Sequence, residues 1–298
     1  MATIEPVDVS RIRVDALSGF GEDSSVNVHM LRLDRMHPFI SGNKWFKLRY
    51  NIEEALHTGN SSILSFGGAY SNHLVALAAA AHAAGLASVG MVRGEEQPGN
   101  PVLQQCREYG MELYFISRAQ YAAKEDAAFL AELCERFPGA LIVPEGGANE
   151  AGERGAAEIA ACIDKRFTHV TLSVGTGTTF TGLRRALSQA QMLLGFAPMK
   201  GGAYLAGTIK EKLQDLPETN WQLYERFHFG GFGKINDEVL SFMNSFREQN
   251  GFDLDRVYTA KMMLGVRELI RERVFPEGAQ ILCIHTGGLT GNDSVKIV

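Results

Sequence analysis

Short apolar runs and longer amphipathic segments follow one another along most of this chain. Runs such as Ser62 to Phe66 and His169 to Val174 have the length of buried strands, and each precedes a segment whose apolar residues recur at helical spacing. Gly85 follows an alanine-rich helical segment that opens at Ser71. Strands that alternate with helices of about 10–18 residues are typical of βα units. The pattern therefore predicts an α/β protein with mostly parallel sheets.

The same pattern gives approximate limits for each element. Strands are expected at residues 26–33, 62–66, 86–92, 111–116, 140–143, 169–174, 191–196, 221–227 and 280–284. Helices are expected at residues 44–59, 71–84, 101–109, 120–137, 152–163, 180–189, 201–213, 235–250 and 259–273. We expect two domains of three-layer α/β type, although no low-complexity linker marks a boundary between them.

Composition and charge narrow the classes of protein. Hydrophobic residues make up 45% and charged residues 21% of the 298 residues, which is ordinary for a globular chain. The net charge of −5 gives no general attraction to nucleic acid. The longest apolar stretch, residues 74–86, is too short to span a bilayer. The N-terminus lacks the basic and apolar blocks of a signal peptide, so we expect a cytoplasmic protein.

Cysteine and histidine form no metal-binding pattern. The four cysteines are isolated from one another, and the eight histidines never form H-E-x-x-H. We expect reduced thiols and no metal site.

One lysine, Lys44, stands at the head of the first amphipathic segment, behind the small polar turn Ser41-Gly42-Asn43. Asn43 is predicted to cap the helix. Apolar residues fall roughly on one face of this helix, and Lys47 is among the charged residues expected mostly elsewhere. Most lysines in a first helical turn are simply solvated, so the importance of Lys44 depends on what surrounds it.

Glycine-rich loops follow four of the expected strands, and ligands of open α/β sheets bind at such strand ends. The loop at 175–179 gives the clearest signal, because its glycines allow close approach and its N–H groups converge at the start of a helix. It has neither the lysine of a nucleoside-triphosphate loop nor the spacing of a dinucleotide loop. We interpret it as a site for a phosphate monoester, with a plain strand–helix turn as the alternative. The loop consists of Gly175, Thr176, Gly177, Thr178 and Thr179.

Four further polar residues have both a functional and a structural interpretation. Ser71 and Asn72 lie where a helix starts and are equally well explained as an N-cap. Tyr258 fits a core tyrosine with a satisfied hydroxyl, and Thr286 fits the cap of a turn.

Together these segments resemble a known family. Its motifs occur here in order as Gly42-Asn43-Lys44, Gly68-Ala69-Tyr70-Ser71-Asn72-His73, the 175–179 loop, Val257-Tyr258-Thr259-Ala260-Lys261 and His285-Thr286-Gly287-Gly288. They resemble the pyridoxal-phosphate enzymes grouped as 1-aminocyclopropane-1-carboxylate deaminases and D-cysteine desulfhydrases. The resemblance spans about Val26 to Gly288 and implies the tryptophan-synthase-β-like fold, fold type II. It also implies a large domain of residues 1–46 and 157–298, with residues 47–156 inserted as a small domain.

The resemblance implies a role for each candidate residue. Lys44 would join covalently to pyridoxal 5′-phosphate, and burial beside the cofactor would lower its pKa. Asn72 would bind the hydroxyl of the cofactor ring, the 175–179 loop its phosphate, and Thr286 would face the ring nitrogen. The substrate carboxylate would lie among Ser71, Asn72 and His73, with Ser71 also available for proton transfer. Tyr258 would lie near the reacting carbons.

Two residues depart from the ring-opening members of that family, and a third departs from the family as a whole. Those enzymes have an acidic residue where this chain has Thr259, and an apolar residue where it has Thr286. Phe232 stands in place of a second active-site tyrosine. A threonine at the ring nitrogen suits elimination better than transamination. The sequence therefore predicts a lyase or deaminase that performs β-elimination on a small amino acid and gives a 2-oxo acid and ammonia.

Three alternatives stay open from the sequence. The first is ring-opening deamination of 1-aminocyclopropane-1-carboxylate, and the second is a protein that binds pyridoxal phosphate without turnover. The third is a nucleotide binder that uses the 175–179 loop. The family also implies a homodimer, with a small amino acid as substrate and neither nucleic acid nor membrane as partner.

Overall fold

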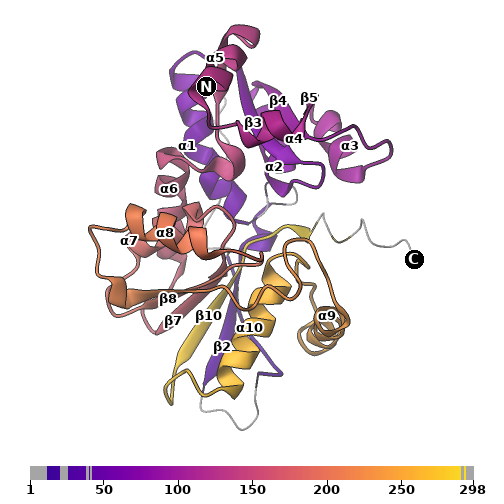
Figure 1. Ribbon diagram of the computed structural model, residues 1–298. Coiled ribbons are helices and arrows are strands. Elements are labelled where there is room, and N and C mark those ends of the chain that lie inside the picture. The colour runs from indigo at the N-terminus through magenta and orange to yellow at the C-terminus, as the bar shows by residue number, and fades with distance from the viewer. Residues whose placement is uncertain (1–11, 21–25, 38–39, 41, 290–291, 293–298) are drawn as a thin grey trace.

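The computed structural model describes residues 12–20, 26–37, 40, 42–289 and 292. Ser41, part of the predicted lysine turn, lies outside them. Two sheets organise the described chain, and they lie one above the other in Figure 1. The larger has six strands in the order β1-β2-β10-β7-β8-β9, and the smaller has four in the order β5-β4-β3-β6.

The larger sheet is parallel except at one edge. Only β1, a short strand that the sequence pattern did not predict, pairs antiparallel, with β2. The other neighbours pair parallel. Its strands are β1 (Val14–Ala16), β2 (Asn27–Arg32), β7 (His169–Ser173), β8 (Met192–Phe196), β9 (Trp221–Tyr224) and β10 (Gln280–His285).

All neighbours in the smaller sheet pair parallel. Its strands are β3 (Ser62–Gly68), β4 (Ala87–Arg93), β5 (Met111–Ile116) and β6 (Ala140–Ile142). The prediction of an α/β protein with mostly parallel sheets is therefore confirmed.

The helices largely follow the predicted order. They are α1 (Asn43–His57), α2 (Asn72–Ala84), α3 (Pro101–Glu108), α4 (Arg118–Ala122), α5 (Ala127–Arg136), α6 (Glu150–Ala157), α7 (Thr178–Ala186), α8 (Ala203–Lys212), α9 (Asp237–Asn250) and α10 (Thr259–Arg271). Within the described chain, no helix combines the length and the apolar character needed to cross a membrane.

Two predicted helices are wrong in extent. The expected helix 120–137 is two helices, because Asp126 accepts hydrogen bonds from the backbone N–H groups of Ala128 (2.9 Å) and Phe129 (3.4 Å) and so starts a new one. The expected helix 152–163 ends as an α-helix at Ala157 and continues as a 3-10 turn over Glu158–Cys162.

Close glycine contacts bring three helices together. A Cβ on Gly155 of α6 would lie 1.8 Å from the Phe46 carbonyl oxygen of α1. A Cβ on Gly182 of α7 would lie 2.3 Å from the Glu153 carbonyl oxygen of α6. Only glycine permits such approach, so α1 and α7 both pack tightly on α6. This packing holds the start of α1, with its lysine, near the start of α7, with its glycine/threonine loop.

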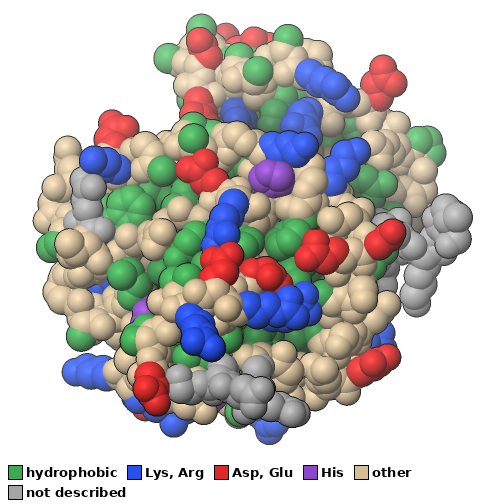
Figure 2. Space-filling view, turned by 60° about the horizontal axis from the view of Figure 1, so that its bottom comes forward, with side chains coloured by type: hydrophobic (Ala, Val, Ile, Leu, Met, Phe, Trp, Pro, Cys, Tyr) green, Lys and Arg blue, Asp and Glu red, His purple; other side chains and the backbone are tan. Residues whose placement is uncertain are grey.

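Charged side chains on the face in Figure 2 are of mixed sign. Side chains of both signs occur over most of that face, several lysines and arginines lie close together toward its upper right, and no patch of one sign covers the whole face. The arrangement agrees with the modest net charge of −5.

Candidate active site

A cavity of about 610 Å³ lies at the carboxyl ends of strands from both sheets. It is lined by the ends of β3, β4 and β7 and by the residues that follow β6 and β10. The predicted residues that line it are Lys44, Ser71, Asn72, His73, Gly175, Thr176, Gly177, Thr179, Tyr258 and Thr286. Thr178 does not line it, and its Oγ1 lies 2.9 Å from Thr176 Oγ1.

The lysine turn lies directly against the turn that follows β10. Gly42 has φ +65°, and a Cβ there would be 1.9 Å from the Thr286 carbonyl oxygen. The prediction that Asn43 caps α1 is wrong, because Gly42 is the N-cap and Asn43 is already helical. The Asn43 side chain instead donates from Nδ2 to Thr179 Oγ1 at 2.8 Å. It thereby joins the lysine turn to the start of α7.

Lys44 presents its amine to this cavity. Its Nζ donates to Asn43 Oδ1 at 2.9 Å. Burial lowers the pKa of Lys44 to about 8, although the negative charge of Asp255 acts to raise it. A fraction of the Lys44 side chains is therefore unprotonated near neutral pH, and attack on an aldehyde requires the unprotonated amine.

The loop at 175–179 leads into a helix start that no side chain caps. Gly177 is the N-cap of α7, has φ +83° and supplies no capping side chain. The first N–H groups of a helix have no partner within the helix, and the helix dipole favours an anion beside them. These donors suit a phosphate group.

Lys47 is a site residue that the sequence pattern missed. It is 4% exposed, although the pattern assigned it to a charged face. Its Nζ lies 3.6 Å from the position that a Cβ on Gly146 would occupy. Thr176 Cγ2 lies 3.2 Å from the same position, so the Lys47 amine is near the loop at 175–179. Burial, and next the charge of Lys44, hold the pKa of Lys47 well below its usual value. The spacing carried a signal, since residues three apart on a helix share a face.

The start of α2 forms another wall. Ser71 is its N-cap, and its Oγ accepts from the Leu74 N–H at 3.3 Å, so the structural interpretation of Ser71 is confirmed. The Asn72 Nδ2 lies 3.0 Å from the Cβ position of Gly288, beside the turn that follows β10. His73 is 4% exposed, and its Nε2 lies 2.8 Å from Ser65 Oγ. Burial keeps the pKa of His73 well below its usual value, so the ring is neutral.

Tyr258 lies across the cavity next to the loop at 175–179. Its hydroxyl oxygen is 3.6 Å from the Cβ position of Gly175. Burial raises the pKa of Tyr258, so the hydroxyl keeps its proton through neutral pH. The ring of Phe232 meets it edge to face, with centroids 5.8 Å apart.

Asp255, a second residue that the sequence pattern missed, precedes Tyr258 by three residues and lines the same cavity. It is 1% exposed, and its Oδ1 accepts from the backbone N–H groups of Tyr258 (2.6 Å) and Thr259 (3.4 Å). Burial raises its pKa to about 6, against the opposing effect of these hydrogen bonds. Within the described chain its Oδ2 has no hydrogen-bond partner, which leaves a buried acceptor near Lys44.

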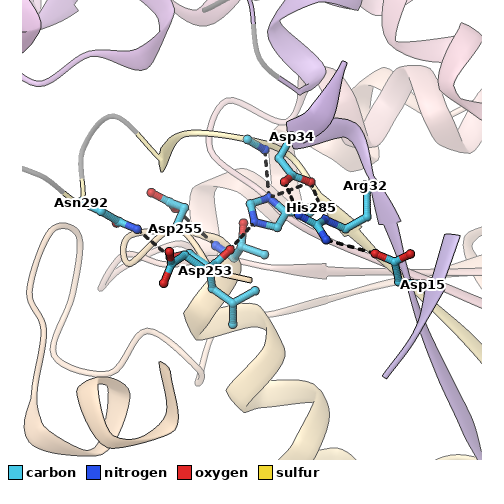
Figure 3. A network of polar contacts seen from close by, with 10 residues as sticks. Asp15, Arg32, Asp34, Asp253, Asp255, His285 and Asn292 are labelled. Atoms are coloured by element: carbon cyan, nitrogen blue, oxygen red, sulfur yellow. Dashed lines mark hydrogen bonds and ion pairs between the residues drawn. The ribbon is translucent and has the colours of Figure 1, made fainter. Parts of the chain in front are cut away.

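A polar network behind Thr286 holds the end of β10 (Figure 3). The Gly287 N–H donates to His285 Nδ1 at 3.2 Å, and His285 Nε2 lies 3.0 Å from the Asp253 carbonyl oxygen. These partners assign the proton of a neutral imidazole to Nε2, in keeping with a pKa lowered by burial. Arg32 holds both oxygens of Asp34 at 2.8 and 2.7 Å on the other side of the ring.

These residues fit pyridoxal phosphate by the chemistry of the donors. Lys44 offers a buried amine for the aldehyde, and the uncapped start of α7 with Lys47 offers donors for the phosphate. The amine for the aldehyde and the donors for the phosphate lie in the same cavity. The site therefore has the features of a pyridoxal-phosphate enzyme.

Comparison with known proteins gives the family. The family model described as "Pyridoxal-phosphate dependent enzyme" matches residues 11–287, and the chain belongs to that family. The predicted cofactor, pyridoxal phosphate, is thereby confirmed, and the chain is a pyridoxal-phosphate-dependent enzyme.

Individual relatives agree with the more specific resemblance. A Pyrococcus horikoshii protein provisionally named 1-aminocyclopropane-1-carboxylate deaminase is 28% identical, over 93% of this chain and 89% of that protein. A D-cysteine desulfhydrase of Klebsiella pneumoniae is 26% identical, over 84% and 83%. A crystal structure of a homologue of 1-aminocyclopropane-1-carboxylate deaminase superposes with a TM-score of 0.82 at 26% identity, over 94% and 90%. The predicted family resemblance and fold type II are confirmed.

Proposed function

We propose that this enzyme eliminates a β-substituent from a small amino acid, in the manner of a D-cysteine desulfhydrase. Amino acid and water give a 2-oxo acid, ammonia and the protonated leaving group. With D-cysteine the products are pyruvate, ammonia and hydrogen sulfide. The observation that carries the proposal is that Lys44 lines one cavity together with the loop at 175–179 and the start of α2, and burial lowers its pKa to about 8.

The cofactor would be held by two groups of donors. The N–H groups at the start of α7 and the Lys47 amine would bind its phosphate, and Asn72 would lie at the ring hydroxyl. Thr286 would face the ring nitrogen as a neutral partner. When bound, pyridoxal phosphate supplies an electron sink for negative charge at the substrate α-carbon.

The protein's own groups would orient the substrate and move protons. The substrate carboxylate would be held where Ser71, Asn72 and His73 begin α2, since a helix start favours an anion. Lys44 would accept the α-proton, with Ser71 as the second candidate, because both line the cavity. Tyr258 would hold its proton at the hydroxyl oxygen and donate it to the leaving group, which its raised pKa permits.

Substitution of the lysine tests this proposal. We expect the purified enzyme to have visible absorbance that borohydride removes, and Lys44→Ala to lack it. Lys165→Ala, at an exposed lysine, is the matched control and should keep the absorbance. If Lys44→Ala keeps an unchanged, borohydride-sensitive absorbance, Lys44 is not the residue that binds the cofactor covalently.

Product analysis separates the proposal from its main alternative. The alternative is ring-opening deamination of 1-aminocyclopropane-1-carboxylate, the activity for which the Pyrococcus relative is named. We expect pyruvate from D-cysteine. Release of 2-oxobutyrate from 1-aminocyclopropane-1-carboxylate, with no pyruvate from D-cysteine, would favour the alternative. Absorbance without α-proton exchange on any D- or L-amino acid would favour a binding protein without turnover.

The wider organisation belongs to the same proposal. We propose a large domain of residues 1–46 and 157–298 with residues 47–156 inserted, supported by the membership of the two sheets. We also propose a cytoplasmic homodimer that acts on a small amino acid and binds neither nucleic acid nor membrane. The net charge of −5 supports the last point, and gel filtration tests the dimer.

A further inference from the structure

Arg93 ends strand β4 at the rim of the cavity. In the sheet it pairs with Gly68, the residue that precedes the loop leading to Ser71. Its Nη2 lies 3.8 Å from the Cβ position of Gly68, so the guanidinium lies beside that loop. The guanidinium carbon is also 5.4 Å from the ring centre of Tyr121, which is only 6% exposed. The buried ring gives the arginine a fixed neighbour.

Arg93 also lies on the boundary of a second, open hollow. That hollow has a volume of about 1020 Å³ and shares Ala69, Tyr70 and Arg93 with the active-site cavity. A substrate side chain that extends past Arg93 therefore has space beyond the inner cavity. D-Cysteine would use only the inner part.

The acidic residues of the inner cavity already have partners in the protein. Asp34 pairs with Arg32 at 2.7 Å, Glu145 lies 3.6 Å from Lys124, and Asp255 accepts backbone hydrogen bonds. Within the described chain, the exposed guanidinium of Arg93 has neither an ion pair nor a hydrogen bond to an acceptor. A guanidinium keeps its charge at any relevant pH and offers a fork of donors that matches an oxyanion. Arg93 thus presents a positive charge to the cavity that no acidic side chain of the described protein neutralises by contact.

We propose that Arg93 determines specificity by binding a second anionic group, carried at the far end of the substrate's β-substituent. The preferred substrates are then amino acids whose leaving group ends in a carboxylate or another oxyanion. The proposal rests on the proposed β-elimination, in which the α-carboxylate is bound at the start of α2. Arg256 also lines the cavity, but from the large sheet's side, after β9 and α9 in the chain.

S-carboxymethylcysteine and its neutral amide isostere, S-carbamoylmethylcysteine, test this proposal as D- and L-forms. Elimination from the acid with one water gives pyruvate, ammonia and mercaptoacetate, so the C–S bond breaks and the sulfur leaves with a proton. For the holoenzyme we expect kcat/KM for the acid to exceed that for the amide by about 10- to 100-fold, the usual effect of a charge-assisted hydrogen bond. O-phosphoserine distinguishes a preference for phosphate from one for carboxylate.

Matched variants assign the preference to one residue. Arg93→Gln should abolish the difference between acid and amide, and Arg93→Lys should keep part of it. Arg118→Gln removes a charge from the outer hollow alone and should change the ratio less than twofold. Arg256→Gln should leave the ratio intact. A ratio near one in the unaltered enzyme, or one that persists in Arg93→Gln, overturns the proposal. So does an equal loss for acid and amide in Arg93→Gln, because that result makes Arg93 a ligand of the α-carboxylate.

Equilibrium binding separates failure of this proposal from failure of the proposed function. Calorimetric titration of the holoenzyme with those enantiomers of the acid and the amide that are not turned over should show the same 10- to 100-fold preference, lost in Arg93→Gln. If no amino acid yields a 2-oxo acid, β-elimination is wrong, and the binding ratio still decides the role of Arg93. Equal binding of acid and amide overturns the role of Arg93 whether or not turnover is found. Unchanged melting temperature and cofactor absorbance show that the variant is folded.

Discussion

Gly42→Ala is the sharpest test of how the lysine turn is built. At φ +65° and ψ −141°, Gly42 occupies a backbone region that is nearly exclusive to glycine, at a cost of about 1–3 kcal/mol for another residue. The new methyl group would also lie 1.9 Å from the Thr286 carbonyl oxygen. The two chain segments must therefore separate by about 1 Å, and overpacking of that kind costs about 1–3 kcal/mol. The expected total is about 2–6 kcal/mol.

This free energy converts into a measurable shift in melting temperature. An unfolding entropy of about 2.1 cal/mol/K per residue gives about 0.6 kcal/mol/K for 298 residues. Gly42→Ala should therefore melt about 3–10 °C below the unaltered enzyme. It should also bind pyridoxal phosphate more weakly, because both Lys44 and Thr286 move.

Gly85→Ala is the control, since Gly85 has φ +71° with nothing within 4 Å of the Cβ position. It carries only the left-handed backbone cost of about 1–2 kcal/mol and should melt about 2–3 °C lower, with normal cofactor absorbance. Thermal denaturation with and without pyridoxal phosphate checks both variants. The reasoning is refuted if Gly42→Ala has the same melting temperature as Gly85→Ala and retains full cofactor absorbance.

Further predictions concern the lysines. Lys47→Met should raise the dissociation constant of pyridoxal phosphate about 10- to 100-fold while that of pyridoxal changes little, since only the former has a phosphate; equal losses in two absorbance titrations would contradict this. Because the Lys44 amine loses its proton near pH 8, the rate of cofactor uptake by apoenzyme should rise from about pH 7 and level off above about 9. A stopped-flow profile that stays flat would refute it. Lys261→Met removes the 2.6 Å hydrogen bond from Lys261 Nζ to the Gly231 carbonyl, in the loop that carries Phe232. A buried carbonyl without a partner costs about 1–3 kcal/mol, so calorimetry should show a melting temperature about 2–5 °C lower, and an unchanged value would show that the bond contributes nothing.

Local signals in the sequence predicted most of the fold. Strand-length apolar runs gave the parallel sheets, and Gly85 ends α2 in the left-handed conformation expected of a helix C-terminus. The break between α4 and α5 was missed because the residues around it favour a helix. The break is marked by Asp126, whose side chain caps the start of α5. Strand β1 was missed because three residues give no periodicity.

The candidate site was predictable in composition and less so in contacts. Its motifs line one cavity, as the strand ends of a parallel fold require. The helical pattern assigned Lys47 to a charged face, yet the loop after β6 covers it, and no local rule encodes that packing. Asn43 has the composition of a helix cap, but its amide bonds to Thr179, which is 136 residues away. Such pairings arise only when distant segments meet.

Pyruvate formation from D-cysteine, measured in parallel for the unaltered enzyme and Lys44→Ala, tests the central claim most directly. The account predicts that the unaltered holoenzyme releases pyruvate, ammonia and sulfide in equal amounts and that Lys44→Ala releases none above background. Equal pyruvate release by Lys44→Ala would contradict it. So would a holoenzyme with borohydride-sensitive absorbance that yields no 2-oxo acid from any β-substituted amino acid of either configuration.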